Sequence, residues 1–264
     1  MLANQNASPI VEVSSLSFRY SQETPLVLRD INLQLHSGER HLLVGANGSG
    51  KTTLLRVIAG KHMIGRDNVR LWGRPAFHDT SLSSKVTYTG GTFRCFVDIT
   101  VAEMLERRGD ANPKRMGILT DLLRIDPSWH MNRVSAGQRR RVQLLVELLY
   151  EKPLLLLDEV TSDLDIVVRA DLLNFLKDET KARGVCVFYA THVLDGMEEW
   201  ATHLTAMERG KIKHSSPIGN LEELNKLKAS GHYSPVYRLV ERWIRDNDDS
   251  KEKNQVIPPD REDC

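Results

Sequence analysis

A glycine-rich loop between an apolar strand and an apolar helix constrains this 264-residue chain more than any other feature of its sequence. The loop fits the pattern G-x-x-x-x-G-K-[ST] at every position. Its glycines let the backbone curl so that successive N–H groups point inward, where phosphate oxygens bind. The helix predicted for residues 52–59 would present its positive N-terminal end to the same anion. The loop residues are Gly45, Ala46, Asn47, Gly48, Ser49, Gly50, Lys51 and Thr52.

Two side chains of the loop suit a bound nucleotide. Lys51 would reach the β- and γ-phosphates as a point charge, and Thr52 would place its hydroxyl on Mg²⁺. We include Thr53, the next residue, among the nucleotide-binding residues. A chance glycine turn before a helix is the alternative, but the apolar run at residues 41–44 leads straight into the loop and favours the phosphate site.

A second apolar run, at residues 154–157, ends in two carboxylates, Asp158 and Glu159. Ligands of open α/β sheets bind at the carboxyl ends of the strands. Asp158 would hold Mg²⁺ through water, and Glu159 would polarise the attacking water as a general base. A strand that merely ends in solvated acids is the alternative, but one nucleotide site accounts for this run and for the loop together.

Two further positions are candidates for the same site. Ser135 begins a predicted helix, and the free amides behind such an N-cap form a second anion site. A plain helix cap is an equally good interpretation of Ser135. His192 follows the apolar strand at residues 185–189, so it lies beside the other strand ends. A lone histidine there is more often structural, but this placement favours a role in the site.

Strands and helices alternate along the chain, and the strands are continuous apolar runs. This pattern predicts an α/β fold with a mostly parallel sheet covered on both faces. We expect one domain at residues 10–220, with a helical insert at about 92–133. Within the insert, Thr100 and Glu103 form a capping-box pattern, and Asn112 precedes a proline as at a helix start.

The C-terminal part divides into a helical extension at residues 221–246 and a tail at 247–264. The tail is rich in acids and contains two consecutive prolines, so we expect it to be disordered. A stripe in the extension forms one apolar helix face, which more often packs on its own domain than docks a partner. Its members are Val236, Leu239, Val240, Trp243 and Ile244.

Composition excludes several classes of protein. Lysine and arginine number 36 and the acids 35, so the charge balance disfavours a generic polyanion binder and we expect no direct binding of nucleic acid. The run of three arginines at residues 139–141 fits a solvated or phosphate-facing helix surface. Three cysteines without CxxC spacing suit a reducing compartment rather than zinc or disulfides. Apolar runs far shorter than about 20 residues predict no membrane span, and the polar N-terminus resembles no signal segment.

The motifs together resemble the nucleotide-binding domain of the ATP-binding cassette (ABC) family. The loop at 45–52 is similar to the family's Walker A motif, residues 154–158 to its Walker B motif, and Glu159 to its catalytic glutamate. His192 is similar to its switch histidine, and Tyr20 to the aromatic residue that stacks on adenine. The resemblance implies a P-loop NTPase core with a mostly parallel sheet, an antiparallel β subdomain and a short helical insert. It also implies ATP and Mg²⁺ as cofactors.

Two more motifs resemble the family with single substitutions. The signature motif contains an alanine in place of its usual second-position glycine, and the D-loop, at residues 162–165, contains Asp163 where a small residue is common. The resemblance implies that the signature motif binds nucleotide. Its residues are Ser135, Ala136, Gly137 and Gln138.

One element departs from the family pattern. The family places a glutamine, which touches Mg²⁺ and the lytic water, at the junction between the core and the helical insert. Gly91 stands at that position, and the insert is short. These departures resemble the soluble, non-intrinsic ABC ATPases of eukaryotes. That group includes plant subfamily I members and a fungal relative associated with a deadenylase and transcription-regulating complex.

The resemblance implies that ATP joins two copies head to tail as a homodimer. The signature helix of one copy would cover the γ-phosphate held by the other. Glu159 would activate the water, His192 would contact the γ-phosphate, and Lys51 would stabilise the developing charge.

Three functions remain open. The first is a soluble ATPase that switches a partner complex in gene expression, in the cytoplasm or also in the nucleus. The second is the ATPase subunit of a multi-chain transporter, and the third is an interaction protein that binds ATP with little turnover. The missing glutamine favours the first over the second, and the intact Glu159 and His192 disfavour the third.

Overall fold

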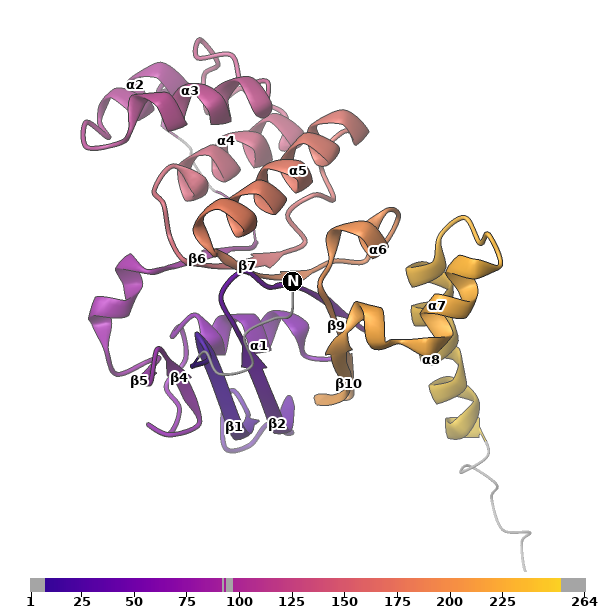
Figure 1. The fold of residues 1–264 in the computed structure, drawn as a ribbon. Helices are drawn as coiled ribbons and strands as arrows, with labels where there is room; N and C mark the ends of the chain where they lie inside the picture. The colour runs from indigo at the N-terminus through magenta and orange to yellow at the C-terminus, as the bar shows by residue number, and fades with distance from the viewer. Residues whose placement is uncertain (1–7, 92, 94–96, 253–264) are drawn as a thin grey trace, which may run out of the picture.

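The computed structural model describes residues 8–91, 93 and 97–252, which build two β-sheets and the helices around them (Figure 1). The strands are β1 Val11–Phe18, β2 Leu28–Leu35, β3 Arg40–Val44, β4 Val69–Leu71, β5 Arg74–Pro75, β6 Val86–Thr89, β7 Leu154–Asp158, β8 Cys186–Ala190, β9 His203–Glu208 and β10 Lys211–Pro217. The α-helices are α1 Lys51–Ile58, α2 Val101–Glu106, α3 Pro113–Leu122, α4 Ala136–Leu148, α5 Ile166–Arg183, α6 Met197–Trp200, α7 Glu222–Ala229 and α8 Pro235–Glu252. Within these ranges, every helix is too short or too polar to cross a bilayer.

The larger sheet has the strand order β10-β9-β3-β8-β7-β6. Its strands pair in parallel except for β10, which returns antiparallel to β9 through a turn at Arg209 and Gly210. Every residue of β3, β7 and β8 is buried, because helices or a second sheet cover both faces. The predicted α/β fold with a mostly parallel sheet is confirmed. The carboxyl ends of β3, β7 and β8 therefore meet at one edge, where the site forms.

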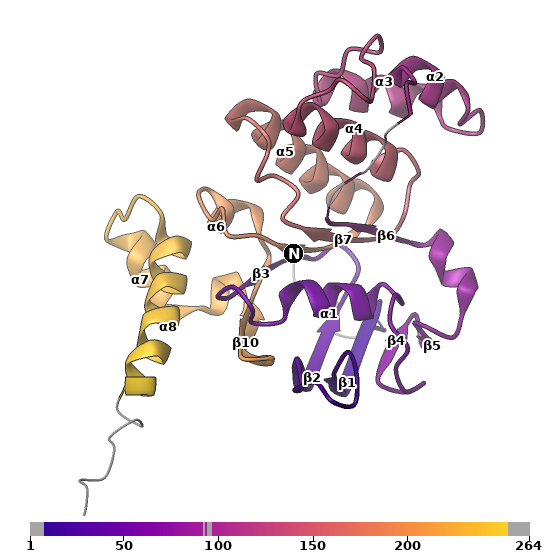
Figure 2. The ribbon, with the colours of Figure 1, turned by 180° about the vertical axis from the view of Figure 1, so that it is seen from behind.

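Two hydrophobic cores lie on opposite faces of this sheet. On one face, Leu155 and Leu157 pack with apolar residues of α4 and α5. On the other, Leu154 and Leu156 pack with α1 and with the antiparallel sheet. Figure 2 shows α4 and α5 on one side of β6 and β7, with α1 on the opposite side. This layering leaves the start of α1 at the sheet edge from which the ligand-binding loops emerge.

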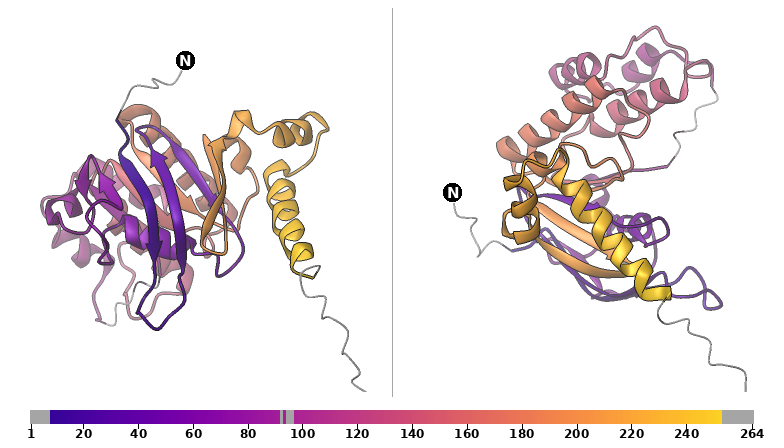
Figure 3. Two further views of the ribbon diagram at one scale, coloured as in Figure 1. Left: turned by 90° about the horizontal axis from the view of Figure 1, so that it is seen from below. Right: turned by 90° about the vertical axis from the view of Figure 1, so that its right-hand side faces the viewer.

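The smaller sheet has the order β2-β1-β4-β5 and is antiparallel, as expected for the β subdomain (Figure 3, left). The irregular alternation of β1 has a structural cause. The register with β2 shifts between Val13 and Leu16 and again before Phe18, and Ser15 has a positive φ of 43°. The local bulges bring Val13, Leu16 and Phe18 all into the core.

Helices α2 and α3 fall within the segment predicted to be a helical insert. Thr100 Oγ1 accepts a hydrogen bond from Glu103 N at 3.2 Å, and Glu103 Oε2 accepts one from Thr100 N at 2.8 Å, so the predicted capping box is present. Asn112 Oδ1 accepts from Lys114 N at 3.0 Å and caps α3. Local capping thus accounts for where both helices begin.

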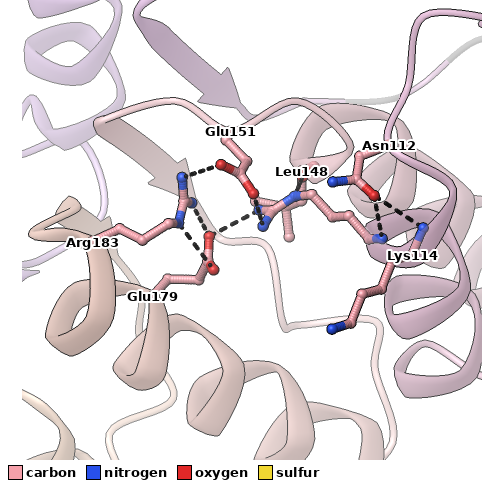
Figure 4. Close-up of polar contacts among 7 residues, drawn as sticks. Asn112, Lys114, Leu148, Glu151, Glu179 and Arg183 are labelled. Atoms are coloured by element: carbon pink, nitrogen blue, oxygen red, sulfur yellow. Dashed lines mark hydrogen bonds and ion pairs between the residues drawn. The ribbon is translucent and has the colours of Figure 1, made fainter.

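A buried arginine ties α3 to α5 and to the end of α4. Figure 4 shows Glu151, Glu179 and Arg183, three charged residues of the same network. Arg115 donates from Nε to Leu148 O at 2.8 Å and from Nη2 to Glu179 Oε2 at 2.9 Å. Arg183 pairs with the same Glu179 and also with Glu151 at 3.1 Å. Because Arg115 and Glu179 are largely buried, each charge depends on the others for its stability.

The C-terminal helix α8 packs its apolar stripe on the body of the protein. Val236 and Leu239 are fully buried, which confirms that the stripe packs on its own domain. Trp243 stacks on His214 of β10 at 4.4 Å between ring centroids, so α8 lies beside the β9–β10 hairpin (Figure 3, right).

The expected end of this helix was wrong. Helix α8 continues to Glu252, so residues 247–252 of the predicted disordered tail are helical. A formed helix propagates through polar residues at little cost, which a composition argument ignores. The rest of the predicted tail lies outside the described residues.

Candidate active site

The loop at residues 45–52 leaves β3 and ends at the first turn of α1. Gly45, Gly48 and Gly50 all have positive φ angles, which favour glycine. At Gly45 a Cβ would also lie 2.3 Å from Met207 O, so the adjacent strand β9 excludes any side chain there. Both backbone conformation and close approach therefore account for the glycines in the predicted pattern.

Lys51 and Ser49 of this loop direct their polar atoms toward the loop itself. Lys51 Nζ donates to Gly45 O at 2.6 Å and to Ala46 O at 3.1 Å. Burial lowers the pKa of Lys51, while the nearby Glu159 carboxylate opposes that shift. Ser49 Oγ is buried and makes no hydrogen bond within the described part of the chain. A buried hydroxyl and an inward-facing ammonium in a glycine-rich loop fit a phosphate group.

Asp158, at the end of β7, contacts the loop directly. Its Oδ1 accepts a hydrogen bond from Thr52 Oγ1 at 3.2 Å. Burial raises the pKa of Asp158, and the adjacent Glu159 carboxylate raises it further. A hydroxyl and a carboxylate side by side are hard oxygen donors, the ligand chemistry that Mg²⁺ prefers. Thr52 and Asp158 are therefore the residues that would hold Mg²⁺.

Glu159 and His192 lie together at the same edge of the sheet. His192 Nδ1 is 2.8 Å from Glu159 Oε2. Glu159 has a positive φ of 51°, in the sparsely populated left-handed region. Backbone strain of this kind is common at functional sites, where the surrounding structure maintains it. A cavity of about 270 Å³ brings Glu159 and Asp158 together with the loop residues from Asn47 to Thr53.

Tyr20 lies beside this cavity rather than in its lining. Its hydroxyl shares a hydrogen bond of 3.0 Å with Thr53 Oγ1. Its ring meets Phe18 and His62 edge to face, at 5.2 Å and 5.4 Å. The side chain is 52% exposed, so part of the ring faces solvent next to the start of α1.

The predicted signature residues lie at the start of α4 and form a capping box. Ser135 Oγ accepts from Gln138 N at 3.2 Å, and Gln138 Oε1 accepts from Ser135 N at 2.9 Å. Among the described residues, the lining of the phosphate-loop cavity includes none of the positions 135–138. A single copy therefore does not bring these residues to its own loop.

Gly91, at the position expected for glutamine, is held through its backbone. Arg140 of α4 donates from Nη1 to Gly91 O at 3.1 Å and to Gln143 Oε1 at 2.9 Å. Arg140 Nε also lies 3.7 Å from Asp163 Oδ2. One arginine of the run predicted to be a solvated or phosphate-facing surface thus links the start of the helical insert to the loop that follows β7. No pattern in the sequence indicates this contact.

Tyr88 and Arg56 are further residues of the site that sequence reasoning missed. Tyr88, on β6, donates to Asp158 Oδ2 at 3.3 Å, and Arg56 Nε donates to the Tyr88 hydroxyl at 3.1 Å. In sequence, Tyr88 is an ordinary aromatic in a predicted strand, and Arg56 is an ordinary polar position on a helix. Only the pairing of β6 with β7 places the phenol at the end of the Asp158 strand.

The fold and the site define a class of protein, an ATPase built on a phosphate-binding loop. A model of the ABC transporter family matches residues 28–162, and the chain belongs to that family.

Relatives extend the match over most of the chain. The plant protein ABC transporter I family member 21, from Arabidopsis thaliana, is 42% identical over 97% of this chain and 94% of its own length. CCR4-associated factor 16, from Saccharomyces cerevisiae, is 40% identical over 76% of both chains.

Solved structures have the same fold. The ATP-binding subunit of an ABC transporter superimposes with a TM-score of 0.72 at 24% identity and covers 88% of this chain and 98% of its own. A dimeric ATP-binding cassette in a post-hydrolysis state, bound to ADP and phosphate, gives a TM-score of 0.65 at 20% identity. It covers 79% of this chain and 98% of its own. The predicted P-loop ATPase fold, with its parallel core and antiparallel β subdomain, is confirmed.

Proposed function

We propose that two copies of this protein close around ATP and Mg²⁺, hydrolyse the ATP, and separate again. The observation that supports this most is the separation of two anion-binding elements within one copy. Lys51 and Thr52 of the phosphate loop share one cavity with Asp158. Ser135, at the start of α4, is not among the described residues that line this cavity. Each copy would supply what the other lacks. The solved cassette bound to ADP and phosphate is itself dimeric, which supports a dimer here.

The residues of the site divide the chemistry among them. Bound Mg²⁺ would screen the charge of the phosphates. Lys51 and the loop amides would orient the β- and γ-phosphates, and Thr52 and Asp158 would hold the metal. Glu159 would accept the proton of the attacking water, and His192 would keep that carboxylate oriented beside the γ-phosphate. Tyr20 would stack on adenine, with its hydroxyl anchored on Thr53.

The start of α4 would complete the site from the partner copy. The Ser135 hydroxyl and the free amides behind it would bind the γ-phosphate at the positive end of the helix. Ala136, Gly137 and Gln138 form this first turn, and Gly137 lies close to Asp163 O, where a Cβ would come to 3.0 Å. Glycine at position 137 allows the loop after β7 to approach the start of this helix closely.

We propose that this cycle regulates a partner protein complex in gene expression, in the cytoplasm and also in the nucleus. Identity of 40% or more to a plant ABC transporter I family member and to CCR4-associated factor 16 supports this role. The domain division proposed from sequence, a cassette at 10–220 followed by a helical extension, also fits the elements. The helical extension ends at Glu252.

An ATPase subunit of a transporter is the second candidate. Sulfate/thiosulfate import ATP-binding proteins match this chain at 30% identity, which supports that function less strongly. Purification of the native protein distinguishes the two. Integral membrane proteins that co-purify in stoichiometric amounts would favour transport, and a set of non-membrane partners would favour regulation.

The test of the ATPase cycle is the substitution Glu159→Gln. It keeps the shape of the side chain but removes the base, so hydrolysis should fall by about 10²–10⁴-fold while ATP still binds. Light scattering during gel filtration should then detect a stable dimer in ATP and Mg²⁺. Glu106→Gln, on the exposed end of α2, is the matched control and should hydrolyse ATP like the original protein. A monomer with unchanged phosphate release would refute the assignment of Glu159.

A further inference from the structure

We propose that Tyr88, held by Arg56, positions the Asp158 carboxylate and so takes over part of the work of the glutamine that Gly91 replaces. Tyr88 is a positioning residue in this proposal, because it acts through Asp158 rather than on the nucleotide. The inference rests on the proposed role of Asp158 as the carboxylate that holds Mg²⁺.

The geometry gives each oxygen of Asp158 one donor. Oδ1 accepts from Thr52 Oγ1 at 3.2 Å, and Oδ2 accepts from the Tyr88 hydroxyl at 3.3 Å. Two donors on opposite oxygens restrict rotation of the carboxylate about its last bond. A carboxylate held in this way meets a metal ion, or its bound water, without having to be reoriented first.

Arg56 determines the direction of the phenol hydrogen. A guanidinium can only donate, so the Tyr88 oxygen must accept the hydrogen bond from Arg56 Nε at 3.1 Å. The phenol then directs its own hydrogen to Asp158. Arg56 lies one helical turn after Thr52 on α1, so the same face of this helix contacts Asp158 both directly and through Tyr88.

The tyrosine ring is held as well as its hydroxyl. The ammonium of Lys61 lies 5.1 Å from the ring centroid, within cation–π distance. Tyr88 pairs with Leu156 across β6 and β7, two residues before Asp158. A strand advances about 3.3 Å per residue, so the phenol extends about 6.6 Å along the strand direction to reach the carboxylate.

Gly90 provides independent support. A Cβ at this position would lie 2.7 Å from the Tyr88 hydroxyl oxygen and 2.8 Å from Asp158 Cβ. Gly90 is absent from the glycines with positive φ, so close approach rather than backbone conformation requires glycine here. Gly90, the residue before Gly91, therefore leaves the space in which the Tyr88 hydroxyl meets the Asp158 carboxylate.

Gly91 itself has no side chain that could reach the metal site. A Cβ there would meet nothing within 4 Å, so space does not exclude a larger residue. Its positive φ of 74° does favour glycine. The backbone at position 91 thus disfavours glutamine. The polar contact with Asp158 comes instead from Tyr88, three residues earlier on β6.

The decisive experiment compares Tyr88→Phe with the original protein in Mn²⁺ binding, followed by electron paramagnetic resonance with a non-hydrolysable ATP analogue. Phenylalanine keeps the ring and removes only the hydrogen bond. A hydrogen bond to a charged group is worth enough to weaken Mn²⁺ binding by about tenfold. Nucleotide binding without metal should stay unchanged, and urea unfolding should show one cooperative transition, as in the original protein.

Tyr150→Phe is the matched control, because Tyr150, which follows α4, also donates to an aspartate, Asp110 of the helical insert, at 2.7 Å. It should bind Mn²⁺ like the original protein. Asp158→Asn separates the two ways in which the proposal can fail. If it leaves Mn²⁺ affinity unchanged, the proposed metal role of Asp158 is wrong. If it weakens Mn²⁺ binding while Tyr88→Phe does not, the positioning role of Tyr88 is overturned.

Discussion

His192 contacts Glu159 twice on one oxygen and leaves the other oxygen free. The imidazole Nδ1 lies 2.8 Å and the backbone nitrogen 3.4 Å from Glu159 Oε2, and Ser162 Oγ donates to the same oxygen at 3.3 Å. Among the described residues, no donor contacts Oε1. Three contacts on Oε2 orient the carboxylate so that Oε1 can accept a hydrogen bond from a water molecule.

Replacing His192 by alanine should therefore slow hydrolysis more than it weakens binding. The loss of the imidazole frees Glu159 to rotate, so we expect phosphate release to fall by about 10²-fold at saturating ATP. The ATP affinity, measured by calorimetry, should change far less. His130→Ala removes a similar pair, His130 with Asp98 at 2.7 Å, and should have no effect on turnover. If His192→Ala turned over within a factor of two of the original protein, Glu159 would not depend on it.

A mixing experiment tests whether α4 of one copy serves the loop of the other. Lys51→Ala should abolish phosphate binding, and Ser135→Asp should repel the γ-phosphate. Aspartate caps a helix as well as serine does, so Ser135→Asp should remain folded.

Each variant alone should be inactive. An equal mixture should recover activity, because a mixed dimer contains one site with both Lys51 and Ser135 intact. Phosphate release measured against the mixing ratio should then show a maximum. A mixture as inactive as its components would exclude a site shared between copies.

The histidine cluster at the opposite edge of the sheet should make stability depend on acid pH. His203 and His41 are register partners on β9 and β3, and their rings stack at 4.3 Å and 5°. The Glu39 carboxylate lies 2.8 Å from His41 Nε2.

The two groups of this cluster with lowered pKa values, His203 and Glu39, both make the fold less stable in acid. Burial lowers the pKa of His203 from 6.5 to about 4, so the unfolded chain takes up its proton first. Burial raises the pKa of Glu39, but the hydrogen bonds from His41 and from the His36 backbone, together with the charges of His41 and His203, outweigh burial and lower the pKa to about 2. The free energy of unfolding should thus decrease as pH falls from 6.5 to 4, by on the order of 2 kcal/mol from His203, and further toward pH 2 as Glu39 protonates.

Urea unfolding at several pH values measures this dependence. His203→Gln should flatten the curve between pH 6.5 and 4, while the lower part remains. His78→Gln, an exposed histidine on the β subdomain, should leave the curve unchanged. The same slope in His203→Gln as in the original protein would show that other groups control acid stability.

Arg115→Met should destabilise the protein by about 3 kcal/mol, because it leaves part of the Glu179 charge buried without its partner. Hydrogen exchange should then increase most in α3, whose attachment to α5 depends on this arginine. Lys114→Met, on the neighbouring exposed position, should change the free energy of unfolding by less than about 0.5 kcal/mol. Uniform exchange throughout the chain in Arg115→Met would show that the network does not hold α3 specifically.

Features that depend on neighbouring residues could be predicted from sequence. The capping residues Thr100 and Asn112 were recognised because each bonds amides two or three positions ahead. Asp165 caps α5 in the same way, and Gly184 ends that helix in the left-handed conformation. These contacts form within one helical turn, so the order of the residues alone is enough to identify them.

The contacts that complete the site join segments far apart in the chain. Tyr88 and Asp158 are 70 residues apart, and Arg140 and Gly91 are 49 apart. A short-range pattern has no access to these pairs, because they depend on which strands become neighbours and on where a helix crosses them.

The amino-acid order was sufficient for the nucleotide loop, the apolar strands that end in carboxylates, and the α/β class, since each is encoded in contiguous residues whose period or spacing reflects local backbone geometry. The pairing of β6 with β7, the packing of α8 and the side chains that orient Asp158 and Glu159 were decided by the folded chain. The physical reason is that burial brings together groups whose separation in sequence carries no information about their distance in space.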